Sequence, residues 1–224
     1  MQFKLSPPLL YLDVSQPFEV NPQVYAQFGL VGHNGTDYRA PAGTPIFATH
    51  DGIVTFTGED GGGGLGVVLR TIGRYEYLDK EVFFKTIYWH CKVGSFQVKP
   101  GDIVKAGDKI AEVDNTGFST GNHLHFGLKP VLQGEQEWQW ENLLQNNGFK
   151  GAINPELFLI MLQLKKIKGQ KDIYAIGKDN KKHLIINYRT FIEGVNMGMW
   201  DTDVLEVDSL QEEDGNVIIL VENE

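Results

Sequence analysis

The chain has 224 residues, enough for one sizeable domain or for a medium domain and a small one. Its net charge of −9 argues against a nucleic-acid partner, because phosphate binding favours a basic surface. No apolar run approaches the length of a membrane-spanning helix, and a single cysteine, Cys91, excludes an internal disulfide. With 26 glycines against nine prolines, the composition favours many turns and a β-rich fold.

Residues 1–30 are expected to form an irregular N-terminal lead-in, because prolines interrupt their apolar positions. The first residues, "MQFKLSPPLLYLDV", do not resemble a secretory signal, since they carry one lysine and only a broken apolar stretch. We therefore expect either release by a route without a signal, such as that of a phage lysin, or removal of the signal from this chain.

Residues 31–130 predict short strands separated by turns that contain glycine. Strand composition is clearest in "TPIFATHDGIVTFTG", "GVVLRTI", "KTIYWHCKV" and "VKPGDIVKAGDKIAEV". His50 lies at the turn inside the first of these stretches, so we expect a solvated polar side chain there.

Residues 131–167 predict a polar insertion followed by a helix. Trp138 and Trp140 alternate at strand spacing, and they either wall a substrate groove or pack under the helix. In "NPELFLIMLQLKK", Asn154 suits an N-cap and Pro155 suits the first turn. The apolar residues that follow have the spacing of one buried helix face: Leu157, Ile160, Met161 and Leu164.

Residues 168–224 predict a small C-terminal β-rich module. A strand–turn–strand pattern occupies "DIYAIGKDNKKHLIINYRTFI", and "GNVIILVEN" predicts a closing strand. His183 is expected at the surface of this module. Binding of the cell wall, binding of a partner and capping of a groove all stay open as its role.

The stretch "STGNHLHFG" places two of the six histidines on one short strand. Residues i and i+2 of a strand face the same side, so His123 and His125 project together. Neutral imidazole is the commonest metal ligand, and a catalytic zinc site usually takes three protein ligands. Upstream, "GHNGTDY" supplies His33 and Asp37, and "YWHC" places His90 near the end of an apolar strand.

Four blocks of the chain, in order, resemble the lysostaphin/LytM-type zinc endopeptidases, which hydrolyse peptidoglycan: "GHNGTDYRAPAGTPIFATHDGIV", "YWHC", "VKPGDIVKAGDKI" and "NTGFSTGNHLHFG". The resemblance covers about residues 31–130. It implies one zinc ion per chain and a mainly β fold, with an antiparallel sheet or sandwich, an open groove and one C-terminal helix. It implies that the zinc ligands are His33, Asp37 and His125, and that the catalytic residues are His90 and His123.

The chain departs from the usual pattern of this family at Cys91 and Gly127. Strand alternation turns Cys91 away from His90, which predicts a small buried apolar side chain. Gly127 comes directly after "HLHF". Because glycine has no side chain, a polar side chain can have no role at that position. Neither residue belongs to the implied ligand set.

The resemblance implies a zinc endopeptidase domain over residues 31–167, with its core at 31–130, acting on peptidoglycan peptides at the cell wall, in the periplasm or outside the cell. The alternatives are a non-catalytic wall-binding or activator module and a structural phage-tail component. The complete set of ligands and catalytic histidines favours the enzyme. The hairpin "VKPGDIVKAGDKI" also resembles biotinyl and lipoyl carriers, but it lacks their tip lysine.

Overall fold

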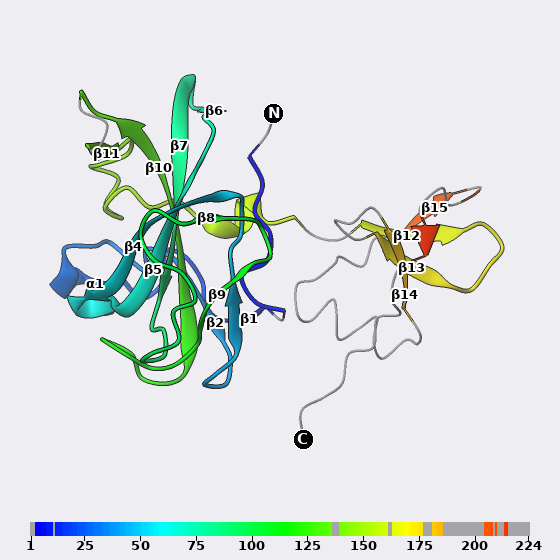
Figure 1. The fold of residues 1–224 in the computed structure, drawn as a ribbon, viewed down its shortest axis with the longest axis horizontal. Coiled ribbons are helices and arrows are strands. Elements are labelled where there is room, and N and C mark those ends of the chain that lie inside the picture. Colours follow the sequence, from blue (N-terminus) through cyan, green and yellow to red (C-terminus); the bar gives the residue numbers. More distant parts are fainter. Residues whose placement is uncertain are drawn as a thin grey trace. The chain divides into compact units, whose positions relative to one another are not determined.

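A computed structural model describes residues 3–10, 12–135, 139–160, 163–176, 181–185, 204–207, 209 and 213–214. Within these residues the protein is mainly β, which confirms the predicted fold class (Figure 1). The chain divides into two compact units. The first comprises Met1–Leu10 and Val14–Leu159, and the second comprises Tyr11–Asp13 and Ile160–Glu224. The main boundary between the two units therefore follows Leu159.

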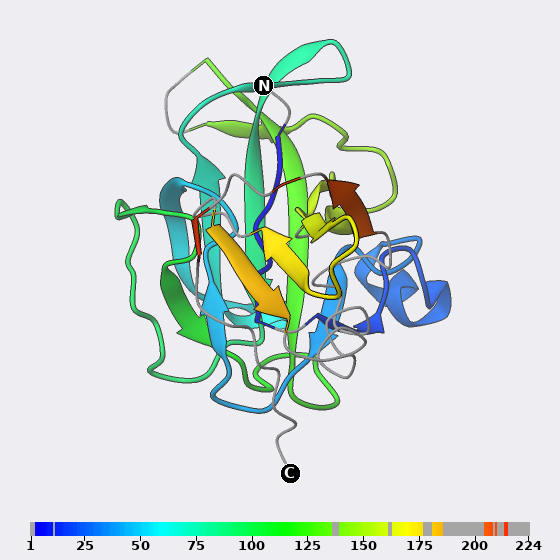
Figure 2. The same cartoon turned by 90° about the vertical axis from the view of Figure 1, so that its right-hand side faces the viewer.

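The first unit is built around one large sheet, whose strands follow the order β1-β2-β10-β7-β5-β4-β8. Its strands are β1 (Asp13–Gln16), β2 (Thr36–Arg39), β4 (Gly52–Asp60), β5 (Gly64–Thr71), β7 (Lys80–Trp89), β8 (Ile103–Val104) and β10 (His123–Gln133). Two short strands extend it, with β6 (Tyr75–Tyr77) on β7 and β11 (Trp140–Asn142) on β10. A separate pair is formed by β3 (Pro45–Phe47) and β9 (Lys109–Glu112). Figures 1 and 2 show β7 and β10 running side by side as the central strands.

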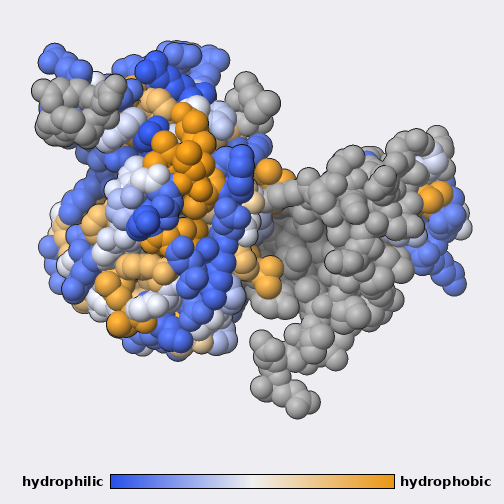
Figure 3. Space-filling view, in the orientation of Figure 1, coloured by the Kyte–Doolittle hydropathy of each residue, from blue (hydrophilic) through white to orange (hydrophobic). Residues whose placement is uncertain are grey.

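Alternation along β10 separates the core from the opposite face of the sheet. Leu124, Phe126 and Leu128 are fully buried, and they point to the side opposite His123 and His125. Burying side chains of this size supplies about 1.5–3 kcal/mol each, so a one-residue slip of register would be costly. Hydrophobic patches are also visible between hydrophilic ones in Figure 3. Exposed apolar surface is ordinary in globular proteins, so these patches do not by themselves mark a binding site.

Most of the segment before residue 31 belongs to the first unit. Phe3 and Leu5 are buried, and Phe3 stacks on Phe84 with ring centroids 4.0 Å apart. The Leu5 amide donates a hydrogen bond to the Phe158 carbonyl at 2.7 Å. Further along, the segment forms the short helix α1 (Pro22–Tyr25) and the 3₁₀ turn η1 (Ala26–Phe28). These described residues of the segment are therefore packed against the rest of the first unit.

The prediction of a helix over residues 154–166 is wrong. Its capping was anticipated, because the Asn154 side chain accepts a hydrogen bond from the Glu156 amide at 3.0 Å. However, the turn that follows is a 3₁₀ helix, η3 (Pro155–Phe158), and Gln163–Ile167 is strand β12. Leu157 is 74% exposed, so the expected apolar face is not buried there. Strand pairing of β12 with β13 and β15 outweighs the helical spacing, as tertiary context often does.

The second unit is β-rich, as the sequence predicts. Its five-stranded sheet has the order β15-β12-β13-β14-β16. The other strands are β13 (Ile173–Ile176), β14 (Lys181–Ile185), β15 (Val204–Val207) and β16 (Glu213–Asp214). The expected closing strand, Trp138 and the side chain of His183 lie outside the described part of the structure. Among the described residues, no helix is long and apolar enough to cross a membrane.

The expectation that His50 is solvated is wrong, whereas the buried Cys91 confirms the prediction made for it. The His50 side chain is 5% exposed. Its Nδ1 donates to the Asp51 carbonyl at 2.9 Å, so its Nε2 accepts from the Thr86 hydroxyl, also at 2.9 Å. Burial lowers the pKa of His50 to about 4, which keeps this imidazole neutral at pH 7. The sequence places His50 in a turn but does not show that the turn folds against β7.

Candidate metal centre

Three of the predicted site residues converge on one point. His33 Nε2 lies 2.9 Å from His125 Nδ1 and 3.1 Å from Asp37 Oδ1, and the last two atoms are 2.9 Å apart. Zinc bonds of about 2.0–2.2 Å in a tetrahedral arrangement place ligand atoms roughly 3.3 Å apart. Two imidazoles and a carboxylate are also the donors that zinc prefers in catalytic sites. The three side chains therefore fit the coordination of one small cation.

Strand pairing between β10 and β2 creates this convergence. His125 lies directly opposite Asp37 in the register, so the two side chains meet on one face of the sheet. His33 precedes β2, and Gly35 lets the chain turn between the two ligands. A Cβ atom at Gly35 would lie 2.7 Å from both His125 Cε1 and the Phe126 carbonyl oxygen. Only glycine leaves room for the imidazole here.

Hydrogen bonds from the N-terminal segment orient the ligands. His33 Nδ1 donates to the Pro17 carbonyl at 3.0 Å, which leaves the Nε2 lone pair directed at the site. The Gln16 amide donates to Asp37 Oδ2 at 3.2 Å and also to the Tyr25 hydroxyl. The Tyr25 ring stacks on His33 with centroids 5.0 Å apart. No motif in the sequence marks these supporting residues, and sequence reasoning missed them.

Asp37 is held as a carboxylate in a site that excludes most water. It is 7% exposed, and burial by itself would raise its pKa. The interactions of the carboxylate with His125 and His33 outweigh burial, so the pKa of Asp37 falls below its ordinary value. The pKa of His125 is lowered, because burial outweighs the opposing effect of Asp37. A negative carboxylate beside two imidazole nitrogens favours occupation by a cation.

The remaining two predicted residues, His90 and His123, flank the ligand set. Their rings are 4.5 Å apart between centroids, and the His90 ring is 6.1 Å from that of His125. His123 Nε2 lies 3.5 Å from Asp37 Oδ2. All five residues that the sequence predicted for the site are thus brought together on one face of the sheet.

Each flanking histidine has one ring nitrogen fixed by a backbone carbonyl. His90 Nδ1 donates to Thr116 at 2.6 Å, and His123 Nδ1 donates to Gly121 at 2.8 Å. In the neutral form, Nε2 of each ring is therefore the nitrogen that can accept a proton. Burial lowers the pKa of His90 to about 4, which keeps it neutral at pH 7. His90 also has a φ of 63°, an uncommon left-handed conformation of the kind found at functional sites.

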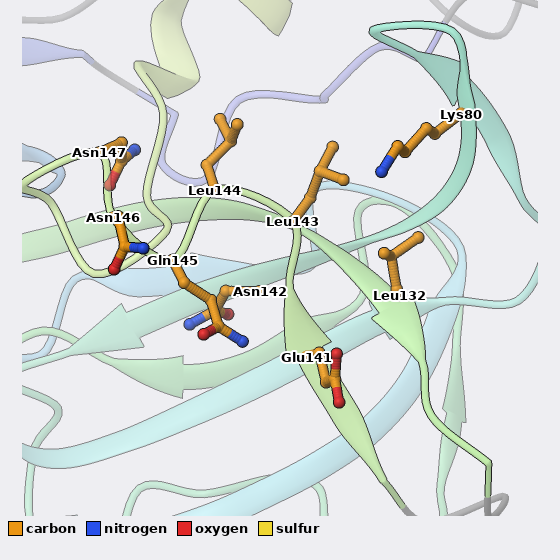
Figure 4. Close-up of a pocket in the computed structure, with 9 residues that line it drawn as sticks. All are labelled: Lys80, Leu132, Glu141, Asn142, Leu143, Leu144, Gln145, Asn146 and Asn147. Atoms are coloured by element: carbon orange, nitrogen blue, oxygen red, sulfur yellow. The ribbon is translucent and has the colours of Figure 1, made fainter.

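An open cavity of about 560 Å³ lies elsewhere on the first unit (Figure 4). It is bounded by Leu132 of β10, Glu141 of β11 and the turn over residues 143–147. Leu132 is seven residues beyond His125, roughly 23 Å along the strand, and it points to the opposite face. The cavity is therefore separate from the metal centre.

Comparisons with known proteins assign the region around the site to a peptidase family. Residues 31–137 match the family model described as Peptidase family M23, which confirms the resemblance found in the sequence. The chain is 37% identical over 119 residues to the DD-carboxypeptidase/endopeptidase Mpg of Neisseria meningitidis serogroup B, covering 53% of this chain and 25% of Mpg. It is 38% identical over 100 residues to the peptidoglycan DD-endopeptidase ShyB of Vibrio cholerae, covering 43% of this chain and 20% of ShyB.

Among solved structures, lysostaphin from Staphylococcus simulans is 25% identical, with a TM-score of 0.48, over 70% of this chain and 53% of lysostaphin. The chain spans a quarter or less of the length of the two curated relatives.

Proposed function

Because residues 31–137 match the model of peptidase family M23, we propose that the protein is a zinc-dependent endopeptidase acting on bacterial peptidoglycan. The bonds it hydrolyses are those of the stem or cross-bridge peptides at the cell wall. One observation carries the proposal: a three-ligand centre of His33, Asp37 and His125 is flanked by two further histidines whose Nε2 atoms are available for proton transfer. The names of the relatives support the substrate class.

The residues divide the work of hydrolysis. Bound zinc supplies a Lewis acid for the scissile carbonyl and the attacking water. His33, Asp37 and His125 hold the ion, and the Pro17 carbonyl fixes the tautomer of His33. A neutral imidazole at His90 or His123 accepts the proton of the attacking water and then returns it to the leaving amine. Until it returns the proton, the imidazolium so formed stabilises the negative charge on the carbonyl oxygen. We assign these last two roles to the pair.

The test is digestion of purified sacculi that differ in cross-bridge chemistry, with and without a chelator. We expect new peptide amino termini by mass spectrometry, their loss with chelator and their recovery on adding zinc. His123→Ala, purified in the same way, controls for contaminating hydrolases.

Chelator-resistant cleavage or cleavage within the glycan strands would contradict the proposal. Wall binding without new termini would instead support the non-catalytic binding module or the structural phage-tail component.

A further inference from the structure

Three cationic side chains lie next to one another on the sheet that carries the metal centre. In the strand register, Lys129 of β10 pairs with Lys85 of β7, and Lys85 pairs with Arg70 of β5. We call these three residues the cationic row. Lys129 follows His125 by four positions, so the row lies on the same face of the sheet, roughly 13 Å along β10. Like charges directly opposite one another destabilise a sheet, so this arrangement requires an explanation.

Aromatic rings hold two members of the row, Arg70 and Lys85, in place. The Arg70 guanidinium carbon lies 4.4 Å from the centroid of the Trp140 ring and 4.7 Å from that of Phe83. Lys85 Nζ lies 5.6 Å from the Trp140 centroid. Trp140 in turn meets Phe83 edge to face, with centroids 5.2 Å apart. These cation–π contacts orient the positive groups without neutralising their charge.

Within the described part of the structure, no carboxylate forms an ion pair with the cationic row. Arg70 donates from Nη1 to the Thr71 carbonyl at 2.8 Å, while its Nε is buried and has no hydrogen-bond partner. Burial, with Arg70 adding to it, lowers the pKa of Lys85. Burial also lowers the pKa of Lys129, with smaller contributions from Lys150 and Lys85, while Asp60 acts in the opposite direction. Positive charge is thus concentrated at half-buried positions of a chain whose net charge is −9.

We propose that the cationic row is a subsite for a carboxylate group of the peptide substrate. This inference rests on the proposed function, since it concerns the same face and the same substrate. A distance of roughly 13 Å equals about four residues of extended peptide, so a carboxylate at that remove from the scissile bond reaches the row. Arg70 offers a planar fork that matches a carboxylate, and the two lysines add point charges. Trp140 forms the adjoining wall.

Kinetics on two matched cross-linked peptides test the subsite. One peptide carries free carboxylates, and in the other they are carboxamides. We expect the protein to prefer the acid by about ten- to a hundredfold in kcat/KM, mostly through KM, because the row contacts a remote part of the substrate. Lys85→Met and Lys129→Gln should remove this preference by slowing cleavage of the acid only, and Lys85→Arg should retain part of it. Lys105→Met, at an exposed lysine paired with Asp51, is the matched control and should behave as wild type.

Equal cleavage of acid and amide by the wild type would overturn the subsite, as would an equal loss on both peptides in Lys85→Met. Loss confined to intact walls would assign the row to another anionic wall polymer and would also overturn it. Melting temperature and zinc content of each variant exclude misfolding.

A second measurement separates this proposal from the proposed function. Zinc-free protein, prepared with a chelator, is titrated calorimetrically with short acid and amide stem peptides. Tighter binding of the acid, lost in Lys85→Met, supports the subsite even if the protein cleaves neither peptide. Equal binding of both peptides overturns the subsite even if the endopeptidase activity is real.

Discussion

The two ends of β10 present opposite electrostatic problems on one face of the same sheet. Near its start, His125 meets His33 and Asp37, so that electron-pair donors crowd within about 3 Å of one another. Toward its other end, Lys129 meets Lys85, so that proton donors and positive charges lie side by side. A cation would relieve the repulsion among the electron-pair donors of the first cluster. An anion would relieve the repulsion among the positive charges of the second.

The two ends also differ in how the protein supports them. The proposed ligands His33 and Asp37 are fixed by hydrogen bonds to Pro17 and Gln16, which set the directions of lone pairs. In the cationic row, Arg70 and Lys85 are instead held by aromatic faces, which leave their charges available. A metal demands defined bond directions, whereas a carboxylate tolerates a broader range of donors.

The largest expected effect is at the metal end. His125→Ala leaves two protein ligands, so we expect loss of most bound zinc and of measurable hydrolysis. Elemental analysis of the purified variant measures the zinc. His183→Ala, at a histidine outside the predicted site, serves as control and should keep it. Full zinc occupancy in His125→Ala would refute the ligand assignment.

The flanking histidines should separate catalysis from metal binding. His90→Ala and His123→Ala should retain zinc and lose turnover by roughly a hundredfold or more, the usual scale for a general acid–base group. Zinc content and kcat are measured on the same preparations. A variant that loses its zinc would belong with the ligands instead.

Support of the metal centre by the N-terminal segment predicts a smaller effect. Gln16→Ala removes the hydrogen bond to Asp37, and loss of such an outer contact typically weakens metal affinity by about ten- to a hundredfold. Competition with a chelator of known affinity measures it. Gln97→Ala, which removes a glutamine bonded to the Ser95 carbonyl, is the control. Unchanged affinity in Gln16→Ala would show that the ligands alone set the geometry.

The smallest effect concerns stability at the cationic end. Lys129→Met removes one charge from a row of like charges, so we expect the free energy of unfolding at pH 7 to rise by up to about 1 kcal/mol. Because folding lowers the pKa of Lys129, the unfolded chain binds more protons at pH values between that lowered pKa and the ordinary lysine pKa. The wild type therefore gains stability as pH rises through this range, and its difference from the variant shrinks.

Denaturant titrations of zinc-free protein at pH 7 and at alkaline pH measure this difference, with Lys105→Met as control. A destabilised Lys129→Met would mean that the charge of Lys129 is already balanced in the free protein, which would weaken the carboxylate proposal.

Short-range patterns carried most of what could be predicted about the site. The HxH pair follows from strand alternation, and the HxxxD pair lies within one turn and the strand after it, so both survive without knowledge of the fold. The prediction of a helix over residues 154–166 was wrong because the spacing of apolar residues carries no information about the strands that pair with β12. The prediction that His50 is solvated was wrong for a similar reason, since a turn residue is buried only when another strand packs against it.

By itself, the sequence determined the β-rich class, the family resemblance and the five residues gathered at the metal centre, because each depends on residue types at fixed short spacings. Only the tertiary structure decided which distant groups support or extend that centre. Gln16 reaches Asp37 across 21 residues of chain, and Lys85 faces Lys129 only in one strand register. Such pairings arise from burial of the opposite face of the sheet, which fixes the register without leaving a local mark in the sequence.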